Sequence, residues 1–225
     1  GGADVNHFHA AGGIGFVIRA LISAGLLHDD IMTVAGKTLS DHAKEPMLDG
    51  DALVWRDPPA QSADDTMLRT PANPFLPDGG MRLVTGNLGR GTFKTSSVDK
   101  ERWTIEAPAR VFDDQDQVIA AFKAGELEQD VVVVVRFQGP RATATAARNG
   151  RAPPLGGWPA WGVRVSRVAD GRMSGASGKI PAAIHCTPEA LGNGPLALVQ
   201  DGDVIRLCGH DGVLEVLADL SGRSP

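Results

Sequence analysis

The stretch ADGRMSGASGKIPAAIH, residues 169–185, divides the second half of the chain into a strand-like run before it and a small-residue segment after it. Val163, Val165 and Val168 lead into it with the spacing of a β-strand. Glycines at three positions leave the backbone free to turn tightly and to approach a ligand closely. Such a loop can present backbone N–H groups to an anion or hold a serine at the mouth of a site.

Two features limit this interpretation. A glycine- and serine-rich segment is also a common ordinary turn. It is not a P-loop, because Gly171 and Gly178 are too far apart and Ile180 stands where Ser or Thr is needed. After the loop, Thr187 and Pro188 predict the start of a helix.

A second strand lies upstream of the loop. Val131–Val135 is a continuous β-branched run, which is typical of a strand buried on both faces. The segment 136–141 follows it directly and brings polar groups at Arg136, Gln138 and Arg141. Open α/β sheets place ligands at the carboxyl ends of their strands. We therefore expect Gly139–Arg141 and the Gly171–Gly178 loop to lie at such ends.

The remaining pattern predicts a β-rich α/β fold with a compact barrel or twisted sheet. Apolar alternation predicts strands at 53–55, 81–85, 92–95, 103–106, 162–168, 203–207 and 213–217, the last two forming a hairpin. Apolar residues at helical spacing predict helices around 16–22 and from Asp113 to Leu127. The domain boundaries follow as 1–39, a Pro-rich connection over 40–80, and 81–225.

Composition excludes several classes of protein. The 225 residues are 42% hydrophobic and 22% charged, as in a globular protein. A net charge of -5 implies no general affinity for nucleic acid, and no apolar run has the length of a membrane span. Gly1–Asp4 lacks the features of a signal peptide, so we expect a cytoplasmic protein whose Cys186 and Cys208 are free thiols.

Several motifs together resemble one family, that of the dihydroxy-acid and 6-phosphogluconate dehydratases. They are ADVNHFHAAGG (3–13), TGNLGRG (85–91), APARVFDD (107–114), VVRFQGPR (134–141), and DGRMSGASGK with PAAIH (170–179 and 181–185). The resemblance covers nearly the whole chain. Family members are much longer than 225 residues, so the chain resembles their C-terminal part.

The resemblance implies both a fold and a reaction. The fold is the helical end of an N-terminal domain, an irregular linker, and a swivelling-type barrel like the C-terminal domain of aconitase. The reaction is elimination of water from 6-phospho-D-gluconate to give 2-dehydro-3-deoxy-6-phosphogluconate, in the Entner–Doudoroff pathway. The whole protein is then a hydro-lyase and a homodimer, and we expect the chain alone, without its N-terminal domain, to be inactive.

By motif position, Ser174 matches the serine that the family is thought to use as base. A serine is a poor base unless its surroundings are strongly electropositive, and Arg172 and Lys179 are suited to that. Arg172, Ser177, Lys179 and His9 are the predicted substrate-binding residues, although Lys179 is equally well read as a solvated surface charge. Two further residues are assigned structural roles: Asp170 braces the loop, and His7 makes hydrogen bonds.

The resemblance also implies a [4Fe–4S] cluster and Mg²⁺, but with ligands outside this chain. Cys186 and Cys208 do not fall at the cluster motifs. Ala147 stands where the family places a metal-binding glutamate, and alanine cannot bind Mg²⁺. Residues 142–152 depart from the family pattern, whereas Pro153–Gly156 returns in register. The preserved spacing suggests a pair of compensating frameshifts in the codons for residues 142–169.

Two alternatives stay open. The protein is a dehydratase of another sugar acid or of a dihydroxy acid, or the chain is a catalytically silent fragment or degenerate domain. The absence of the domain that binds the cluster, together with Ala147, favours a chain that is catalytically inactive by itself.

Overall fold

The computed structural model describes residues 3–34, 36, 38–96, 98–143, 162–173 and 180–225. The chain forms two compact units, Gly1–Pro77 and Asp78–Pro225. Residues 40–77, where the sequence predicts a connection, are part of the first unit. The division into 1–39, 40–80 and 81–225 stays a prediction.

The first unit is built on two helices and a hairpin. It contains α1 (Val5–Ala10), α2 (Gly13–Ser23), the 3₁₀ helix η1 (Leu39–Ala43), and the antiparallel strands β1 (Glu45–Asp49) and β2 (Ala52–Arg56). A small core forms around Ala11, Phe16 and Leu68. Gly15 lets α2 approach η1, because a Cβ at this position would lie 2.3 Å from the carbonyl oxygen of Ala43.

His7 has the hydrogen-bonding role expected of it, and it lies in helix α1. The Asp4 carboxylate accepts hydrogen bonds from the backbone N–H groups of Asn6 (3.0 Å) and His7 (3.3 Å). The Asp4 N–H in turn donates to His7 Nδ1 at 3.2 Å. This reciprocal capping satisfies N–H groups that the first helical turn would otherwise leave unpaired.

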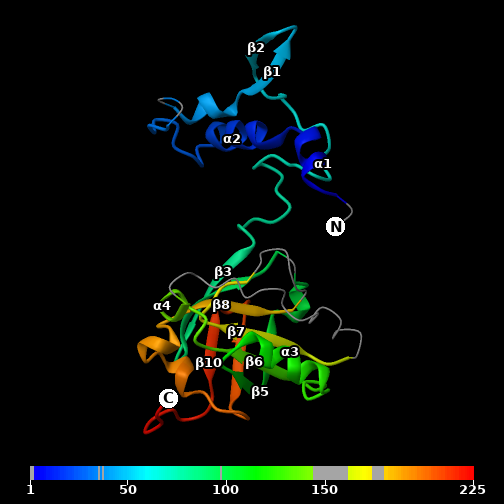
Figure 1. Cartoon of the computed structure of the whole chain (residues 1–225). Helices are drawn as coiled ribbons and strands as arrows, with labels where there is room; N and C mark the ends of the chain where they lie inside the picture. Colours follow the sequence, from blue (N-terminus) through cyan, green and yellow to red (C-terminus); the bar gives the residue numbers. More distant parts are fainter. Residues whose placement is uncertain (1–2, 35, 37, 97, 144–161, 174–179) are drawn as a thin grey trace. The chain divides into compact units, whose positions relative to one another are not determined.

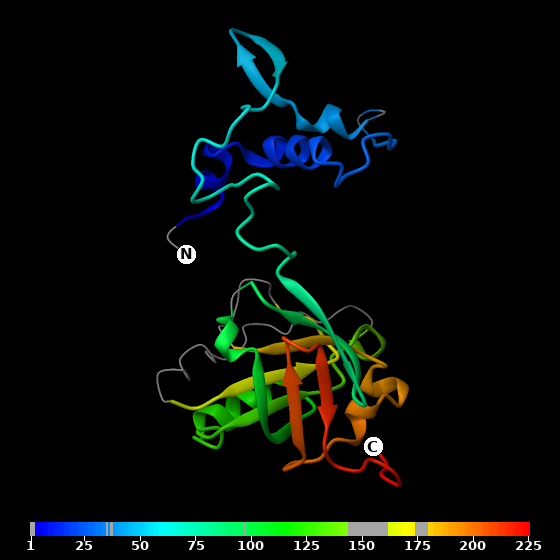
Figure 2. The same cartoon turned by 180° about the vertical axis from the view of Figure 1, so that it is seen from behind.

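The second unit is a closed barrel of eight strands in the order β10-β3-β4-β8-β7-β6-β5-β9 (Figures 1 and 2). The strands are β3 (Met81–Gly86), β4 (Gly89–Lys94), β5 (Thr104–Phe112), β6 (Val131–Val135), β7 (Val165–Ala169), β8 (Ala182–Thr187), β9 (Val204–Cys208) and β10 (Val213–Val216). The helices are η2 (Lys100–Arg102), α3 (Gln115–Lys123), α4 (Pro140–Thr143), η4 (Ala190–Gly192) and η5 (Pro195–Leu198). The predicted β-rich barrel and the β9–β10 hairpin are confirmed.

The residues of β6 explain its place in the wall of the barrel. All five valines are fully buried, as the β-branched run predicts. Val132 and Val134 face the barrel interior with residues such as Phe93 and Ile205. The other three valines face outward, where α3 covers them with Val118 and Ala121 (Figure 1). A strand between two apolar layers needs this pattern.

One predicted element is wrong. Thr187 does not cap a helix: it is the last residue of strand β8, and the next helical turn is η4, which starts at Ala190. The small residues Ala182 and Ala183 pack within the sheet, where burial outweighs the local helix-start signal. None of the helices within the described ranges is long and apolar enough to cross a lipid bilayer.

Candidate functional site at the carboxyl edge of the barrel

Four neighbouring strands of the barrel run parallel, so their carboxyl ends meet at one edge. Val135 of β6 lies opposite Phe112 of β5 and Ala169 of β7, and β7 pairs in parallel with β8. The segments that leave this edge include Arg136–Arg141 and the motif that begins at Asp170. The sequence prediction that both lie at carboxyl ends is confirmed for the described residues, and it is the usual position for ligands in parallel sheets.

Asp170 ties three loops of this edge together. It is 1% exposed. Its Oδ2 accepts from the N–H groups of Phe137 (3.1 Å) and Ala190 (3.1 Å), and its Oδ1 accepts from that of Gln138 (2.9 Å). These bonds join the loops after β6, β7 and β8. The predicted bracing role of Asp170 is therefore confirmed.

Gly171 is required by a close approach of backbone to backbone. A Cβ at this position would lie 2.7 Å from the carbonyl oxygen of Gln138, so any other residue would push the two loops apart. The sequence predicted that the backbone approaches another group closely at the glycines of this loop, but it did not identify Gln138 as the group that Gly171 approaches. The motif therefore leaves β7 in direct contact with the loop after β6.

The structure describes some of the predicted motif residues and not others. The Arg172 side chain is exposed at the carboxyl edge. Met173 is buried against Ala182 and Ile184 on the outer face of the barrel. Ser174, Ser177 and Lys179 lie outside the described residues, as does Ala147. Their roles stay predictions.

Sequence reasoning missed two residues at this edge. His185 lies in β8 with an exposed side chain and a backbone φ of 55°, and its N–H donates to the carbonyl oxygen of Gly171 at 3.0 Å. Glu189 Oε2 accepts from the Arg141 N–H at 2.9 Å. His185 is the last residue of the stretch 169–185 that defines the motif, but no local sequence pattern predicts its left-handed backbone conformation.

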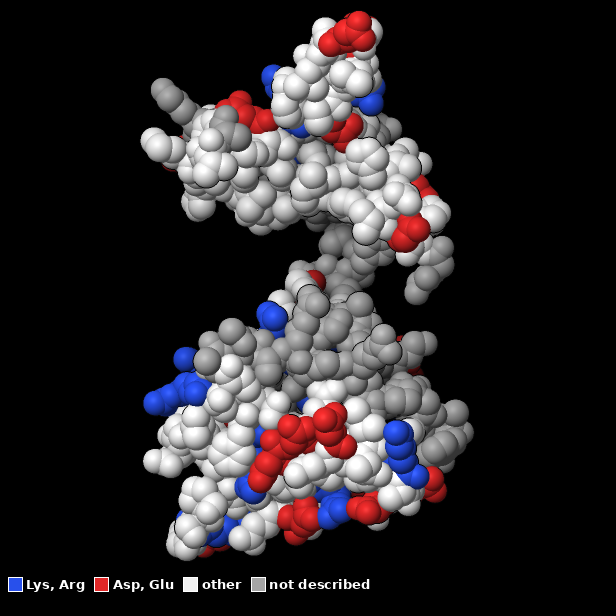
Figure 3. Space-filling model, viewed as in Figure 1, with Lys and Arg blue, Asp and Glu red and all other residues white. Residues whose placement is uncertain are grey.

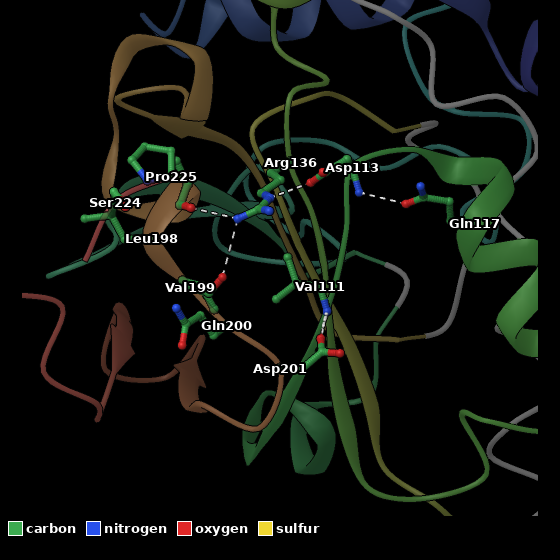
Figure 4. Close-up of a pocket in the computed structure, with 11 residues that line it drawn as sticks. Val111, Asp113, Gln117, Arg136, Leu198, Val199, Gln200, Asp201, Ser224 and Pro225 are labelled. Atoms are coloured by element: carbon green, nitrogen blue, oxygen red, sulfur yellow. Dashed lines mark hydrogen bonds and ion pairs between the residues drawn. The ribbon is translucent and has the colours of Figure 1, made fainter.

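A cavity of about 370 Å³ lies beside the ends of β5 and β6 (Figure 4). Arg136 points into it, but its guanidinium is already engaged: Nε donates to Asp113, and Nη1 donates to the carbonyl oxygen of Ala197 at 2.7 Å. Arg136 therefore links β5, β6 and η5 in the described structure. Because these donors are engaged, they are not available to an anionic ligand in this cavity.

His9, the remaining predicted substrate-binding residue, belongs to the first unit. It is exposed and lines a cavity of about 410 Å³ together with Glu45, Arg56 and Asp57. His9 Nδ1 and Glu45 Oε1 converge on Gly13, because a Cβ there would lie 3.3 Å from the first and 3.6 Å from the second. This is a polar cavity with groups of both charges. Arg172 is in the other unit, so the predicted set of binding residues is divided between the two.

The charged side chains do not form an extended basic surface on the barrel face seen in Figure 3, where described acidic groups lie beside basic ones. The exposed side chains of Arg172 and Arg90 form no ion pair with another described residue, and Arg90 lies opposite Thr187 at the end of β8. The carboxyl edge near β8 thus offers cations for an anionic group of a ligand.

The described residues do not fit an iron–sulfur cluster or a magnesium site. Burial raises the pKa of the Cys186 thiol to about 12, which disfavours the thiolate that a metal requires. Cys208 Sγ lies 3.1 Å from Thr104 Oγ1. Within the described ranges, no three His, Cys, Asp or Glu side chains are placed to hold a metal ion.

Comparison with known proteins identifies the family. Residues 66–223 match the family model described as dihydroxy-acid/6-phosphogluconate dehydratase C-terminal, and residues 1–42 match the corresponding N-terminal model. The chain belongs to this dehydratase family. Among similar proteins, the phosphogluconate dehydratase of Pseudomonas aeruginosa is 53% identical over 97% of the chain, that of Zymomonas mobilis 51% over 96%, and that of Escherichia coli K12 48% over 100%.

The chain spans about a third of the length of these relatives, 36% for the first two and 38% for the third. The match to the N-terminal model is confined to residues 1–42, and that to the C-terminal model covers the barrel. The resemblance to the C-terminal part of the family, expected from the motifs, is confirmed.

Proposed function

We propose that the chain is the C-terminal portion of a 6-phosphogluconate dehydratase, a hydro-lyase that eliminates water from 6-phospho-D-gluconate to give 2-dehydro-3-deoxy-6-phosphogluconate in the Entner–Doudoroff pathway. The observation that carries the proposal is the family motif that leaves β7 at Asp170, at an edge where three loops are locked together by one buried carboxylate. Phosphogluconate dehydratases at 48–53% identity support the choice of substrate.

The chemistry assigns a task to each motif residue. The hydrogen next to the carboxylate is weakly acidic, so its removal needs a strong and well-placed base. Ser174 is the proposed base, and Arg172 with Lys179 would favour its deprotonated form. Ser177, Lys179 and Arg172 suit the phosphate or carboxylate of the substrate. His9 is the proposed contribution of the first unit.

Further parts of the proposal concern the whole protein. A [4Fe–4S] cluster and Mg²⁺ are expected there, with ligands outside this chain. The protein is proposed to be a cytoplasmic homodimer whose N-terminal domain precedes the segment described here. The eight-stranded barrel is proposed to be of the swivelling type found at the C-terminus of aconitase.

A silent domain is the second candidate, and Ala147 is the observation that favours it. Both candidates are tested with the full-length protein from the source gene, reconstituted anaerobically with iron and sulfide in the presence of Mg²⁺. One form keeps Ala147 and the other carries Ala147→Glu. Formation of the 2-keto product is followed with 6-phosphogluconate, gluconate and a 2,3-dihydroxy acid as substrates.

We expect the Ala147→Glu form to convert 6-phosphogluconate in preference to the other two acids, and the Ala147 form to be at least about a hundredfold slower, as for loss of a metal ligand or its support. A preference for gluconate or the dihydroxy acid would refute the substrate assignment. An absence of product from both forms would establish the silent domain.

A further inference from the structure

β8 contains a β-bulge at the point where it passes the motif loop. Thr92 of β4 lies opposite Ile184 and Arg90 lies opposite Thr187. One residue of β4, Gly91, therefore faces two residues of β8, His185 and Cys186. Ile184 packs outward with Met173, whereas Cys186 faces the barrel interior. His185 is the extra residue, and bulges of this kind commonly redirect a side chain beside an active site.

The backbone of His185 is held in an unusual conformation. Its φ of 55° lies in the left-handed region, which residues other than glycine seldom adopt. The bond from its N–H to the carbonyl oxygen of Gly171 fixes this conformation. Its side chain is exposed, and no described group forms a hydrogen bond or ion pair with the imidazole. Among the described residues, the imidazole is thus unpartnered at a position where a regular strand would not place it.

Two contacts fix the position of His185 relative to the described start of the motif. Gly171, its hydrogen-bond partner, opens the loop, and Met173 packs on Ile184, the residue before His185. Among the described residues of these elements, the charged groups include Asp170 and Arg172 of the loop, Arg90 of β4 and Glu189 after β8. Asp170 is buried in its three hydrogen bonds. The exposed side chains of Arg172 and Arg90 can attract an anionic substrate to this place.

We propose that His185 is a catalytic acid of the dehydration, which protonates the departing hydroxyl group; this rests on the function proposed above. The base removes the proton next to the carboxylate, and that electron pair forms the new C=C bond. The C–O bond to the neighbouring hydroxyl breaks as the imidazolium transfers its proton to that oxygen, and water leaves. The enol product becomes the 2-keto acid, and solvent restores the proton on the imidazole. Among side chains, histidine is suited to this because it is partly protonated near neutral pH.

The test uses the full-length reconstituted protein, in whichever of the Ala147 and Ala147→Glu forms turns over 6-phosphogluconate. His185→Gly suits the positive φ and so keeps the bulge, and His185→Gln keeps the size and polarity of the side chain. His28→Gln replaces another exposed histidine, in the first unit, and is the control. The readouts are kcat and KM from pH 5.5 to 9.5, with and without added imidazole.

We expect both His185 variants to lose about 10²–10³ in kcat, the usual contribution of a general acid, with KM changed by less than about threefold. The fall of kcat toward alkaline pH should disappear in the variants, and imidazole should raise the rate of His185→Gly by about tenfold or more. His28→Gln should retain the kcat and pH profile of its parent.

Retention of kcat within about threefold in both His185 variants would overturn the role. So would a loss that imidazole does not restore and that leaves the alkaline limb in place, because this would show a structural effect. If neither Ala147 form is active, the proposed function fails and the role of His185 fails with it. If the parent is active and the His185 variants retain its kcat, only the role of His185 fails. The two failures are therefore distinguishable.

Discussion

Replacement of Arg167 by leucine is expected to stabilise the protein. Arg167 lies in the middle of β7 between Val133 and Ala182, and it is 1% exposed. Within the described part of the chain, no group accepts a hydrogen bond from its Nε or Nη2 atoms. Val165 and Ala169, which share its face of the strand, belong to the apolar layer under α3. A charged side chain at such a position is unfavourable.

The magnitude follows from the pKa. Burial lowers the pKa of the Arg167 guanidinium from its usual value to about 10. With about 1.4 kcal/mol for each pKa unit, this corresponds to about 3 kcal/mol of destabilisation while the group is charged in both states. Leucine removes this cost and adds apolar burial. We expect Arg167→Leu to raise the free energy of unfolding by about 3 kcal/mol and the Tm by about 6–12 °C.

The pH dependence has a definite sign. The folded-state pKa is below the unfolded-state value, so above about pH 10 the unfolded state binds more protons and the stability of the parent rises with pH. Below pH 10 Arg167 is charged in both states, and the destabilisation caused by its burial does not change with pH. The difference in the free energy of unfolding between Arg167→Leu and its parent should therefore be the same from pH 6 to 9 and should decrease above pH 10.

The assay is urea and thermal unfolding of the whole chain, followed by circular dichroism at pH 7 and pH 10.5. The matched control is Arg164→Leu, which alters an arginine just before the same strand whose side chain is 66% exposed and bonded to Asp130. Surface pairs of this kind contribute about 0–1 kcal/mol, so the control should change little. A variant Arg167→Leu that is no more stable than its parent, or less stable, would refute the reasoning, since it would mean that the guanidinium has an acceptor.

Four further outcomes are expected. Ser166→Ala should raise stability by about 1 kcal/mol in the same unfolding assay, because its buried Oγ has no partner in the described chain. Asp170→Ala should lower the stability of the barrel by about 3–5 kcal/mol, because three backbone N–H groups lose their acceptor; a loss below about 1 kcal/mol would contradict its bracing role. A hydrogen bond from Arg223 lowers the pKa of Asp203, so its stabilisation is present above the unfolded value of 3.8 and is lost as the pH falls through the lower folded value; Asp203→Asn should flatten the Tm profile below about pH 4. Because burial raises the pKa of Cys186 to about 12, a disulfide reagent at pH 8 should leave this thiol unmodified in the native protein and label it after unfolding.

Particular residues show what the sequence could predict of the fold. The five valines of β6 predicted a strand buried on both faces, because a strand that has apolar residues on both sides has no solvent face. The acidic residues before Val118 predicted α3, and Asp114 caps it by accepting from the Asp116 N–H. Thr187 misled because its helix-start pattern is local, whereas its place in β8 depends on pairing with Arg90, which lies 97 positions earlier in the chain.

The candidate site was predictable only in part. Asp170 and Gly171 were identified from the motif, and the contacts that explain them came from the loops after β6 and β8. His185 was missed because its bulge depends on the mismatch between two paired strands, which no single segment encodes. The roles of Ser174, Ser177 and Lys179 are predicted from the family resemblance of the sequence alone.

Strand β7 shows how a departure from the family's sequence pattern can preserve the fold and still lower the free energy of unfolding. It lies at the end of the stretch 142–169, for which compensating frameshifts are the proposed origin. Its five residues still pair in register with Val131–Val135, because backbone hydrogen bonds do not depend on side-chain identity. Val165, Val168 and Ala169 supply the burial that the strand needs, whereas Ser166 and Arg167 contribute unpaired polar atoms to it. If frameshifts are the origin, the stretch should therefore lower stability through Arg167 and activity through Ala147. These two effects should be reversible independently, because one lies in packing and the other in the supply of a metal ligand.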